Sequence, residues 1–256
     1  MVVPDVGAYG ECIDLGARLV GTKGVTYASR YSYTVDPATM PQQAAQAVIQ
    51  MKAAGVTSII LATDFIMTLN LTQQASSQNW GPEWLIQGVG FQDYEPFVRL
   101  YNQDRVDGHM FGMSELGTIA ETQGPNSEAG RLYKQLTGRD LPQGAAVEYY
   151  TLLHLFNMLQ AAGPNLSPAA IGAGMYALPP GGPPGVPAGL WSFRTGPDGA
   201  ANVVEHTAVD DAREVYWVNG ATGGDGKRGA FASTYNGRRF TNGEWPAEEP
   251  PVYPGR

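Results

Sequence analysis

Residues 41–64, PQQAAQAVIQMKAAGVTSIILATD, form the stretch that decides the fold. Its first half repeats apolar residues at helical spacing, which predicts an amphipathic helix: Ala44, Ala47, Val48 and Met51. Gly55 can supply the left-handed residue that ends such a helix. Ser58 to Leu61 then predicts a short strand, and its nearly all-apolar composition is typical of a parallel strand covered by helices on both faces. The stretch is therefore one helix-to-strand unit of a parallel α/β sheet.

The residues directly after this strand are the first candidates for a functional site. Open parallel sheets bind ligands beyond the carboxyl ends of their strands. Thr63, Asp64 and Phe65 fall at that end. A carboxylate there could pair with a ligand ammonium or hydroxyl, or it could cap the helix that follows. Both roles stay open for Asp64.

Composition narrows the class of protein. The chain has 256 residues, of which 43% are hydrophobic and 16% charged, as in an ordinary globular protein. Its net charge of −8 argues against a nucleic-acid partner, which needs clustered Lys and Arg. Cys12 is the only cysteine, which excludes intrachain disulfides and cysteine-based metal sites. Residues 1–10 lack the basic start and apolar run of a signal peptide.

The remaining pattern predicts an alternation of helices and strands up to about residue 115. Strands are expected at 26–33, 84–91 and 106–113, and helices at 66–77, 95–103, 124–139, 145–162 and 167–178. Two Gly-rich stretches, 178–189 and 219–230, predict loops, and residues 197–199 predict a turn. The tail after Trp245 is Pro-rich and predicts a mobile end.

The order of these segments resembles the type I periplasmic binding proteins, above all the branched-chain amino-acid binding proteins of ABC transporters. The residues that carry the resemblance are Tyr9-Gly10-Glu11, which would form a strand-to-helix loop, and 51–56, MKAAGV. The long helix at 145–162 and the segment 190–218 extend it over about residues 5–218. No single motif is specific, so order and spacing carry the case.

The resemblance implies an α/β fold with two Venus-flytrap lobes, each a parallel sheet flanked by helices. Lobe two would comprise residues 1–115 and 212–256, and residues 116–211 would be the remaining half of lobe one. The chain crosses between the lobes near 114–118, where Gly117 is the expected hinge. A complete member has a signal peptide and further sheet before the Tyr9 turn, so we expect an N-terminally truncated form. The exposed sheet edge and helix faces of such a form would favour self-association.

The same resemblance implies a ligand site. Tyr9 and Asp64 match ligand-contacting positions of the family, and Phe65 lies beside Asp64. Gly90 and Phe91 fall near the position where amino-acid binders place an acid against the ligand ammonium, so here Asp64 or Asp93 replaces that acid, or Phe91 offers an apolar wall. Phe91 could equally be a core aromatic. Two weaker candidates are Glu115, near the crossover, and Tyr149, which could be a buried helix residue.

Catalytic and metal-binding patterns are missing. The chain has three histidines, His109, His154 and His206, which are far apart and form no metal-ligand pair. No nucleophile elbow occurs, and the Gly-rich stretch 219–230 lacks the residues of a phosphate-binding loop. We therefore expect no cofactor and no catalysis.

The function expected from the resemblance is ligand binding for an ABC importer. The ligand would be a branched-chain amino acid or a similar small organic molecule, and the partner a membrane permease. The full-length form would be periplasmic, or extracellular and anchored to the membrane. The alternatives are a doubly wound α/β enzyme that uses Asp64 with a distant histidine, and the small-molecule sensor domain of a regulator.

Overall fold

A computed structural model describes residues 1–88, 90–115, 124–142, 145–178 and 211–241 of the chain. The helix-to-strand unit that opened the sequence analysis is confirmed. Helix α2 spans Met40–Ala53, and strand β3 spans Ser58–Ile60. The predicted apolar stripe of α2 is fully buried, and Gly55 has a φ of +69° just beyond the helix.

Five parallel strands form the part of the sheet that carries the candidate site. The strands β3, β4 (Glu83–Ile86) and β5 (Met110–Ser114) pair in this order. The strands β1 (Val2–Pro4) and β2 (Tyr31–Tyr33) form a parallel pair of their own. A parallel bridge from Val2 to Leu61, with a 3.0 Å hydrogen bond from Ala62 N to Val2 O, joins that pair to the end of β3. The spatial order is therefore β2-β1-β3-β4-β5.

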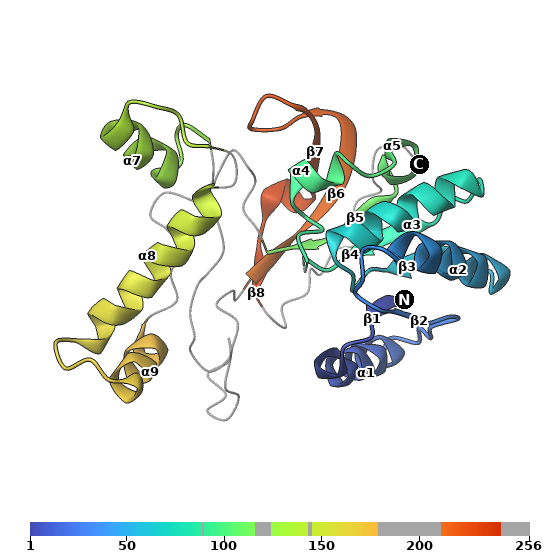
Figure 1. The fold of residues 1–256 in the computed structure, drawn as a ribbon, viewed down its shortest axis with the longest axis horizontal. Coiled ribbons are helices and arrows are strands. Elements are labelled where there is room, and N and C mark those ends of the chain that lie inside the picture. The colour runs from blue at the N-terminus through green and yellow to red at the C-terminus, as the bar shows by residue number, and fades with distance from the viewer. Residues whose placement is uncertain (89, 116–123, 143–144, 179–210, 242–256) are drawn as a thin grey trace.

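Helices cover both faces of these strands (Figure 1). Helices α2 and α3 (Phe65–Ser77) enclose the larger core, which includes Met51, Ile59, Leu71, Trp84 and Met110. Helix α1 (Gly7–Gly21) covers the other face, where Ile13 packs with Met1 and Val3. Val2 and Val3 belong to opposite clusters because neighbouring side chains of a strand point to opposite faces. The doubly covered parallel sheet predicted from the sequence is confirmed.

The strands after residue 210 are antiparallel. Strand β6 (Asp211–Thr222) pairs with β5 and with β7 (Arg228–Ser233), and β8 (Phe240–Thr241) pairs with the start of β6. A short 3-10 helix, η1, spans Tyr235–Gly237. The prediction of a flexible loop at 219–230 is wrong, because most of that stretch is the β6–β7 hairpin. Its glycines allow a tight turn rather than disorder.

Three further helices form a separate packed group (Figure 1). They are α7 (Glu128–Thr137), α8 (Ala145–Ala162) and α9 (Pro168–Ala177). Ser127 and Ser167 cap α7 and α9 by accepting backbone hydrogen bonds, as the sequence predicts for Ser167. Gly174 allows α9 to lie directly on α8, since a Cβ atom there would lie 2.7 Å from the backbone N of Ala162.

Several predicted boundaries are corrected. The strand expected at 26–33 is confined to β2, and the strand expected at 84–91 ends at Ile86. The helix expected at 95–103 is two single turns, α4 (Glu95–Val98) and α5 (Gln103–Val106). The expected hinge at Gly117, the loop at 179–189, the turn at 197–199, residues 190–210 and the tail lie outside the described residues. The division into lobes remains a prediction.

Candidate ligand-binding site

The candidate site lies at the carboxyl edge of the parallel strands, beside the point where the strand order reverses. The chain passes from β1 outward to β2 and then returns to β3 on the other side of β1. Loops after such neighbouring strands leave in opposite directions and leave room for a ligand. Residues 5–7 follow β1 and residues 61–65 follow β3, so the segment around Asp64 borders this point.

Asp64 is the N-cap of α3. Its Oδ1 atom accepts hydrogen bonds from Ile66 N at 2.8 Å and Met67 N at 2.9 Å. The buried Tyr33 hydroxyl donates to Oδ2 at 2.6 Å and accepts from Asp64 N at 3.2 Å. Burial and the bond to Asp64 raise the pKa of Tyr33, so the phenol stays protonated and keeps donating. The capping role that the sequence left open is therefore present, and both carboxylate oxygens have partners.

The loop after β4 rests directly on the loop after β3. Gly90 has a φ of +61°, and a Cβ atom there would lie 2.7 Å from the carbonyl oxygen of Thr63 and 3.1 Å from Cα of Asp64. Only glycine permits both this backbone conformation and this approach. The structure thus brings together two predicted site positions, Gly90 and Asp64, that are distant in sequence.

Phe91 stands out on this loop because its backbone and its exposure are both unusual. Its φ is +60°, which is rare for a residue with a large side chain. The residue is 51% exposed, so it is not a core aromatic. A strained backbone that holds an apolar ring toward solvent is typical of a functional position.

Four aromatic rings gather around Phe91 to form what we call the aromatic shelf: Phe65, Phe91, Tyr94 and Phe97. Phe65 stacks on Phe97 with ring centroids 4.1 Å apart. The ring of Phe97 also lies edge-on to Phe91 at 6.0 Å and to Tyr94 at 5.2 Å. All four rings are at least partly exposed. The sequence predicted Phe65 and Phe91 but missed Tyr94 and Phe97, whose only signal is the three-residue spacing 91, 94, 97.

Buried polar residues fix the loops beneath the shelf. Gln92, also missed from the sequence, is 0% exposed and donates from Nε2 to the carbonyl oxygen of Thr63 at 2.6 Å. Its Nε2 also donates to the Thr63 hydroxyl at 3.0 Å. Asp93 is buried and accepts a 2.8 Å hydrogen bond from the Ser114 hydroxyl at the end of β5. Asp93 therefore joins the loop after β4 to the end of β5.

The other predicted site residues lie at the margins. The prediction that Tyr9 lies in a loop is wrong, because α1 begins at Gly7 and Tyr9 belongs to its first turn. Tyr9 is 54% exposed, and it makes a small contribution to the raised pKa of Tyr33, after burial and Asp64, which places it near the Asp64 side of the edge. Glu115 lies at the surface just beyond β5, and the protein atoms that shield part of its carboxyl from water, together with Asp93, raise its pKa against the opposing effect of Arg239. Tyr149 lies on α8, where burial and a hydrogen bond to Glu128 raise its pKa to about 12.

Neither a metal site nor a catalytic histidine is found at this edge within the described ranges. His109 precedes β5 and so lies at the amino edge, and His154 is on α8. No group of three or more His, Cys, Asp or Glu side chains in the described residues could hold a metal ion. In the same ranges, no helix combines the length and apolarity required to cross a bilayer.

Comparisons with known proteins support the fold. No protein-family model matches the sequence, and no curated protein does. Among solved structures, a fatty acid ABC transporter substrate-binding protein from Thermomonospora curvata aligns with a TM-score of 0.62 at 13% identity over 91% of this chain. A solute binding protein of an ABC transporter from Rhodopseudomonas palustris, solved with 3,4-dihydroxybenzoic acid, aligns at 0.61 with 14% identity over 94% of this chain. A branched-chain amino acid transporter substrate binding protein from Streptococcus pneumoniae, solved with isoleucine, aligns at 0.54 with 14% identity over 91%.

These likenesses show that the chain has the fold of the type I periplasmic binding proteins, as the sequence predicted. The chain spans 55%, 59% and 59% of the lengths of these three proteins. The aligned part is thus a little over half of each neighbour.

Proposed function

We propose that this chain is the ligand-binding part of a substrate-binding protein of an ABC importer, and not an enzyme. The observation that carries the proposal is the aromatic shelf beside the reversal point of the sheet. Four partly exposed rings, one of them on a strained backbone, gather where this fold binds ligands. Exposed aromatic clusters of this kind are typical of binding sites.

The ligand class that fits the shelf is a small organic molecule with an apolar or aromatic part. The ring faces and edges of the shelf offer dispersion and quadrupole contacts to such a part. Because both oxygens of Asp64 already accept hydrogen bonds, a ligand ammonium there would add to an existing network instead of meeting a free carboxylate. Branched-chain amino acids remain within this class, as do aromatic acids and fatty acids.

The mechanism would be closure of two α/β lobes on the ligand, with the closed form recognised by a membrane permease. A ligand shifts such an equilibrium by binding the closed form more tightly than the open one. In this proposal Tyr9 and Glu115 lie at the margins of the site, and the full-length protein acts in the periplasm or outside the cell, anchored to the membrane. The fold of the three neighbours supports this assignment.

The experiment that tests the proposal is titration of the chain with isoleucine, 3,4-dihydroxybenzoate and a medium-chain fatty acid. Isothermal titration is combined with ¹⁹F NMR of chain labelled with 4-fluorophenylalanine, which detects weak binding. We expect saturable binding of at least one probe with shifts of the Phe65, Phe91 or Phe97 signals, and its loss in Phe91→Ala. Leu136→Ala, at an exposed leucine of α7, is the matched control. Absence of saturable shifts, or turnover in a hydrolase screen, would overturn the proposal.

We also propose that the chain associates with a second copy of itself through α8. One face of this helix carries apolar side chains at positions i, i+3, i+4 and i+7, which we call the α8 stripe: Leu152, Leu155, Phe156 and Leu159. The first three are exposed. Glu148 is the only charged residue of α8 and α9, so two stripes can meet with little charge repulsion. A second copy is the partner that this self-complementary face favours.

A further inference from the structure

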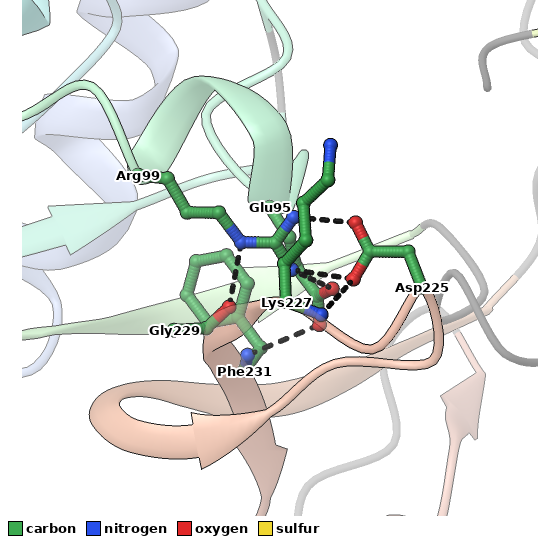
Figure 2. Close-up of polar contacts among 6 residues, drawn as sticks. All are labelled: Glu95, Arg99, Asp225, Lys227, Gly229 and Phe231. Carbon is green, nitrogen blue, oxygen red and sulfur yellow. Dashed lines mark hydrogen bonds and ion pairs between the residues drawn. The ribbon is translucent and has the colours of Figure 1, made fainter.

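Helix α4 connects the aromatic shelf to the β6–β7 hairpin. It is a single turn of four residues, Glu95–Val98, and a helix this short is not stable alone. Phe97 on this turn belongs to the shelf. Glu95 on the same turn, and Arg99 directly after it, bind the hairpin instead (Figure 2). The position of the aromatic shelf therefore depends on the contacts that fix α4 to the hairpin.

Arg99 holds it through a set of contacts that we call the Arg99 clamp (Figure 2). Its Nη1 and Nη2 atoms donate to the two carboxylate oxygens of Asp225 at 2.6 and 3.0 Å. Its Nε donates to the carbonyl oxygen of Gly229 at 2.9 Å, and Nη2 also reaches Glu95 at 3.3 Å. Glu95 in turn accepts from Phe231 N at 3.2 Å. The bonds from this turn to the hairpin join residues 126 to 136 positions apart in sequence.

The clamp is largely withdrawn from water. The side chains of Arg99 and Asp225 are each 14% exposed, and that of Glu95 is 5% exposed. Burial alone would raise the pKa of Asp225, but hydrogen bonds from Arg99 and from Lys227 N lower it below its usual value. Removing one partner would leave the other charge in a largely buried place without its ion-pair partner, which is unfavourable. A bidentate, largely buried pair of this kind fixes geometry more firmly than an exposed ion pair.

The glycines of the hairpin make room for the guanidinium. A Cβ atom on Gly223 would lie 2.6 Å from Nη2 of Arg99 and 2.8 Å from Oε2 of Glu95. A Cβ atom on Gly229 would lie 2.7 Å from the Trp217 ring. Two glycines of this segment, Gly223 and Gly229, are therefore explained by the close approach of Arg99 and Trp217. The β6–β7 hairpin thus packs closely against the side chain of Arg99.

We propose that Arg99 is a positioning residue for the ligand site: by fastening α4 to the β6–β7 hairpin, it holds Phe97, and with it the shelf, in the arrangement that receives the ligand. This inference rests on the proposed function only in calling the shelf a ligand site. The hairpin, distant in sequence, thereby becomes a determinant of ligand affinity without touching the ligand.

The test uses ¹⁹F NMR of the ligand-free chain labelled with 4-fluorophenylalanine, well below its melting temperature. Each signal is assigned by replacing that phenylalanine with leucine. In Arg99→Gln we expect the Phe65 and Phe97 signals to lose the shift that their stacking produces, while Phe156 on α8 stays unchanged. Arg99→Lys should behave like Arg99→Gln, because an ammonium cannot reproduce the bidentate fork. The matched control is Arg30→Gln, which removes an exposed ion pair with Asp14 and should leave every shelf signal in place.

Coupling is tested with Asp225→Asn, a milder change that also covers the case in which Arg99→Gln does not fold. If Asp225 acts through Arg99, the double variant should show the same shelf shifts as Arg99→Gln alone. Unchanged Phe65 and Phe97 signals in a folded Arg99 or Asp225 variant, with only Phe231 shifted, would overturn the inference. Because no ligand is present, this outcome is independent of whether the probes named above bind.

Discussion

Asp64 illustrates how much a single side chain can do at the carboxyl edge. It caps α3 through Ile66 N and Met67 N and accepts the Tyr33 hydroxyl. The Tyr33 bond crosses from the end of β2 to the end of β3, over the intervening strand β1. Asp64 therefore ties strand ends together at the point where the sheet reverses its order.

The first prediction separates capping from ligand binding at Asp64. Asp64→Ala removes the cap and leaves the buried Tyr33 hydroxyl without its acceptor, so we expect the free energy of unfolding to fall by about 1–3 kcal/mol. Asp64→Asn should lose much less, since asparagine caps helices as well as aspartate does. If Asp64 also contacts the ligand, both variants should bind the probe roughly ten- to a hundred-fold more weakly. Urea unfolding and titration give the two readouts, and unchanged affinity in Asp64→Asn would assign Asp64 to capping alone.

The second prediction concerns the pH dependence of the Arg99 clamp. Burial raises the pKa of Glu95 above its ordinary value of 4.5, and this effect outweighs Phe231 N and Arg99, which lower it. The folded state then binds the Glu95 proton more tightly than the unfolded state does. Stability from this group is therefore present at low pH and lost as the pH rises through the raised pKa.

Glu95→Gln cannot titrate, and its amide oxygen can still accept from Phe231 N. We expect the stability of the wild-type chain relative to Glu95→Gln to decrease as the pH rises from ordinary glutamate values toward neutrality. Urea unfolding of both chains at a series of pH values measures it. A relative stability that increases over this range would show that pairing with Arg99 dominates over burial.

At the scale of elements, the site is assembled by loops that touch through their backbones. The loop after β4 reaches the end of β3 at Gly90 and the end of β5 at Gly88, where a Cβ atom would lie 3.3 Å from Glu115 N. Both glycines have positive φ angles. The loops at the carboxyl edge therefore pack against each other through their backbones. Their arrangement depends on Gly88 and Gly90, which have no side chain.

The third prediction compares two glycines with similar backbones and different surroundings. Gly90 and Gly55 have φ angles of +61° and +69°, but a Cβ atom on Gly55 would meet nothing within 4 Å. Gly55→Ala should therefore show only the backbone cost of the left-handed conformation, about 1 kcal/mol. Gly90→Ala adds a clash with the Thr63 carbonyl and should destabilise the chain further and shift the Phe65 and Phe91 ¹⁹F signals. Equal losses of unfolding free energy in the two variants would contradict this account of the loop contact.

The sequence predicted elements better than it predicted their ends. The α2–β3 unit, α3 and α8 were correct because helical or apolar periodicity reports which face is buried. The sequence predicts strand β4 too long, since residues 88–91 consist of glycine and apolar residues and nothing local shows that Gly88 and Gly90 turn the chain. Tyr94, Phe97 and Gln92 were missed because the loop that gathers them becomes a site only when tertiary contacts fold it onto β3.

The β6–β7 hairpin is a second feature that the sequence alone does not predict. Residues 219–230 read as a flexible loop from composition alone. Gly223 and Gly229 in this stretch instead accommodate Arg99 and Trp217, and the contact with Arg99 spans well over a hundred residues of chain. A local sequence pattern does not show which residue more than a hundred positions away will be its contact. The Arg99 clamp therefore cannot be predicted from the sequence.

At the scale of the whole chain, the two groups of elements differ in how well their apolar surface is covered. The parallel strands have helices on both faces, and their core is fully buried. Helix α8 buries Ala146 and Tyr150 against its neighbours but leaves Leu152, Leu155 and Phe156 exposed. Three large apolar side chains on one face are a surface that favours association.

The fourth prediction is that this surface makes the chain self-associate. Sedimentation velocity should show a dimer or larger species whose fraction rises with protein concentration. Phe156→Glu places a carboxylate in the centre of the α8 stripe. If two stripes pack face to face, the two new charges repel each other, so the fraction of monomer should increase. Val35→Glu, at an exposed apolar residue before α2, is the matched control and should leave the distribution unchanged. Phe156→Glu should leave the melting temperature of the sheet nearly unaltered, because Phe156 belongs to none of the buried clusters. A concentration-independent monomer in the wild-type chain would contradict the prediction, and an oligomer that persists in Phe156→Glu would place the interface elsewhere.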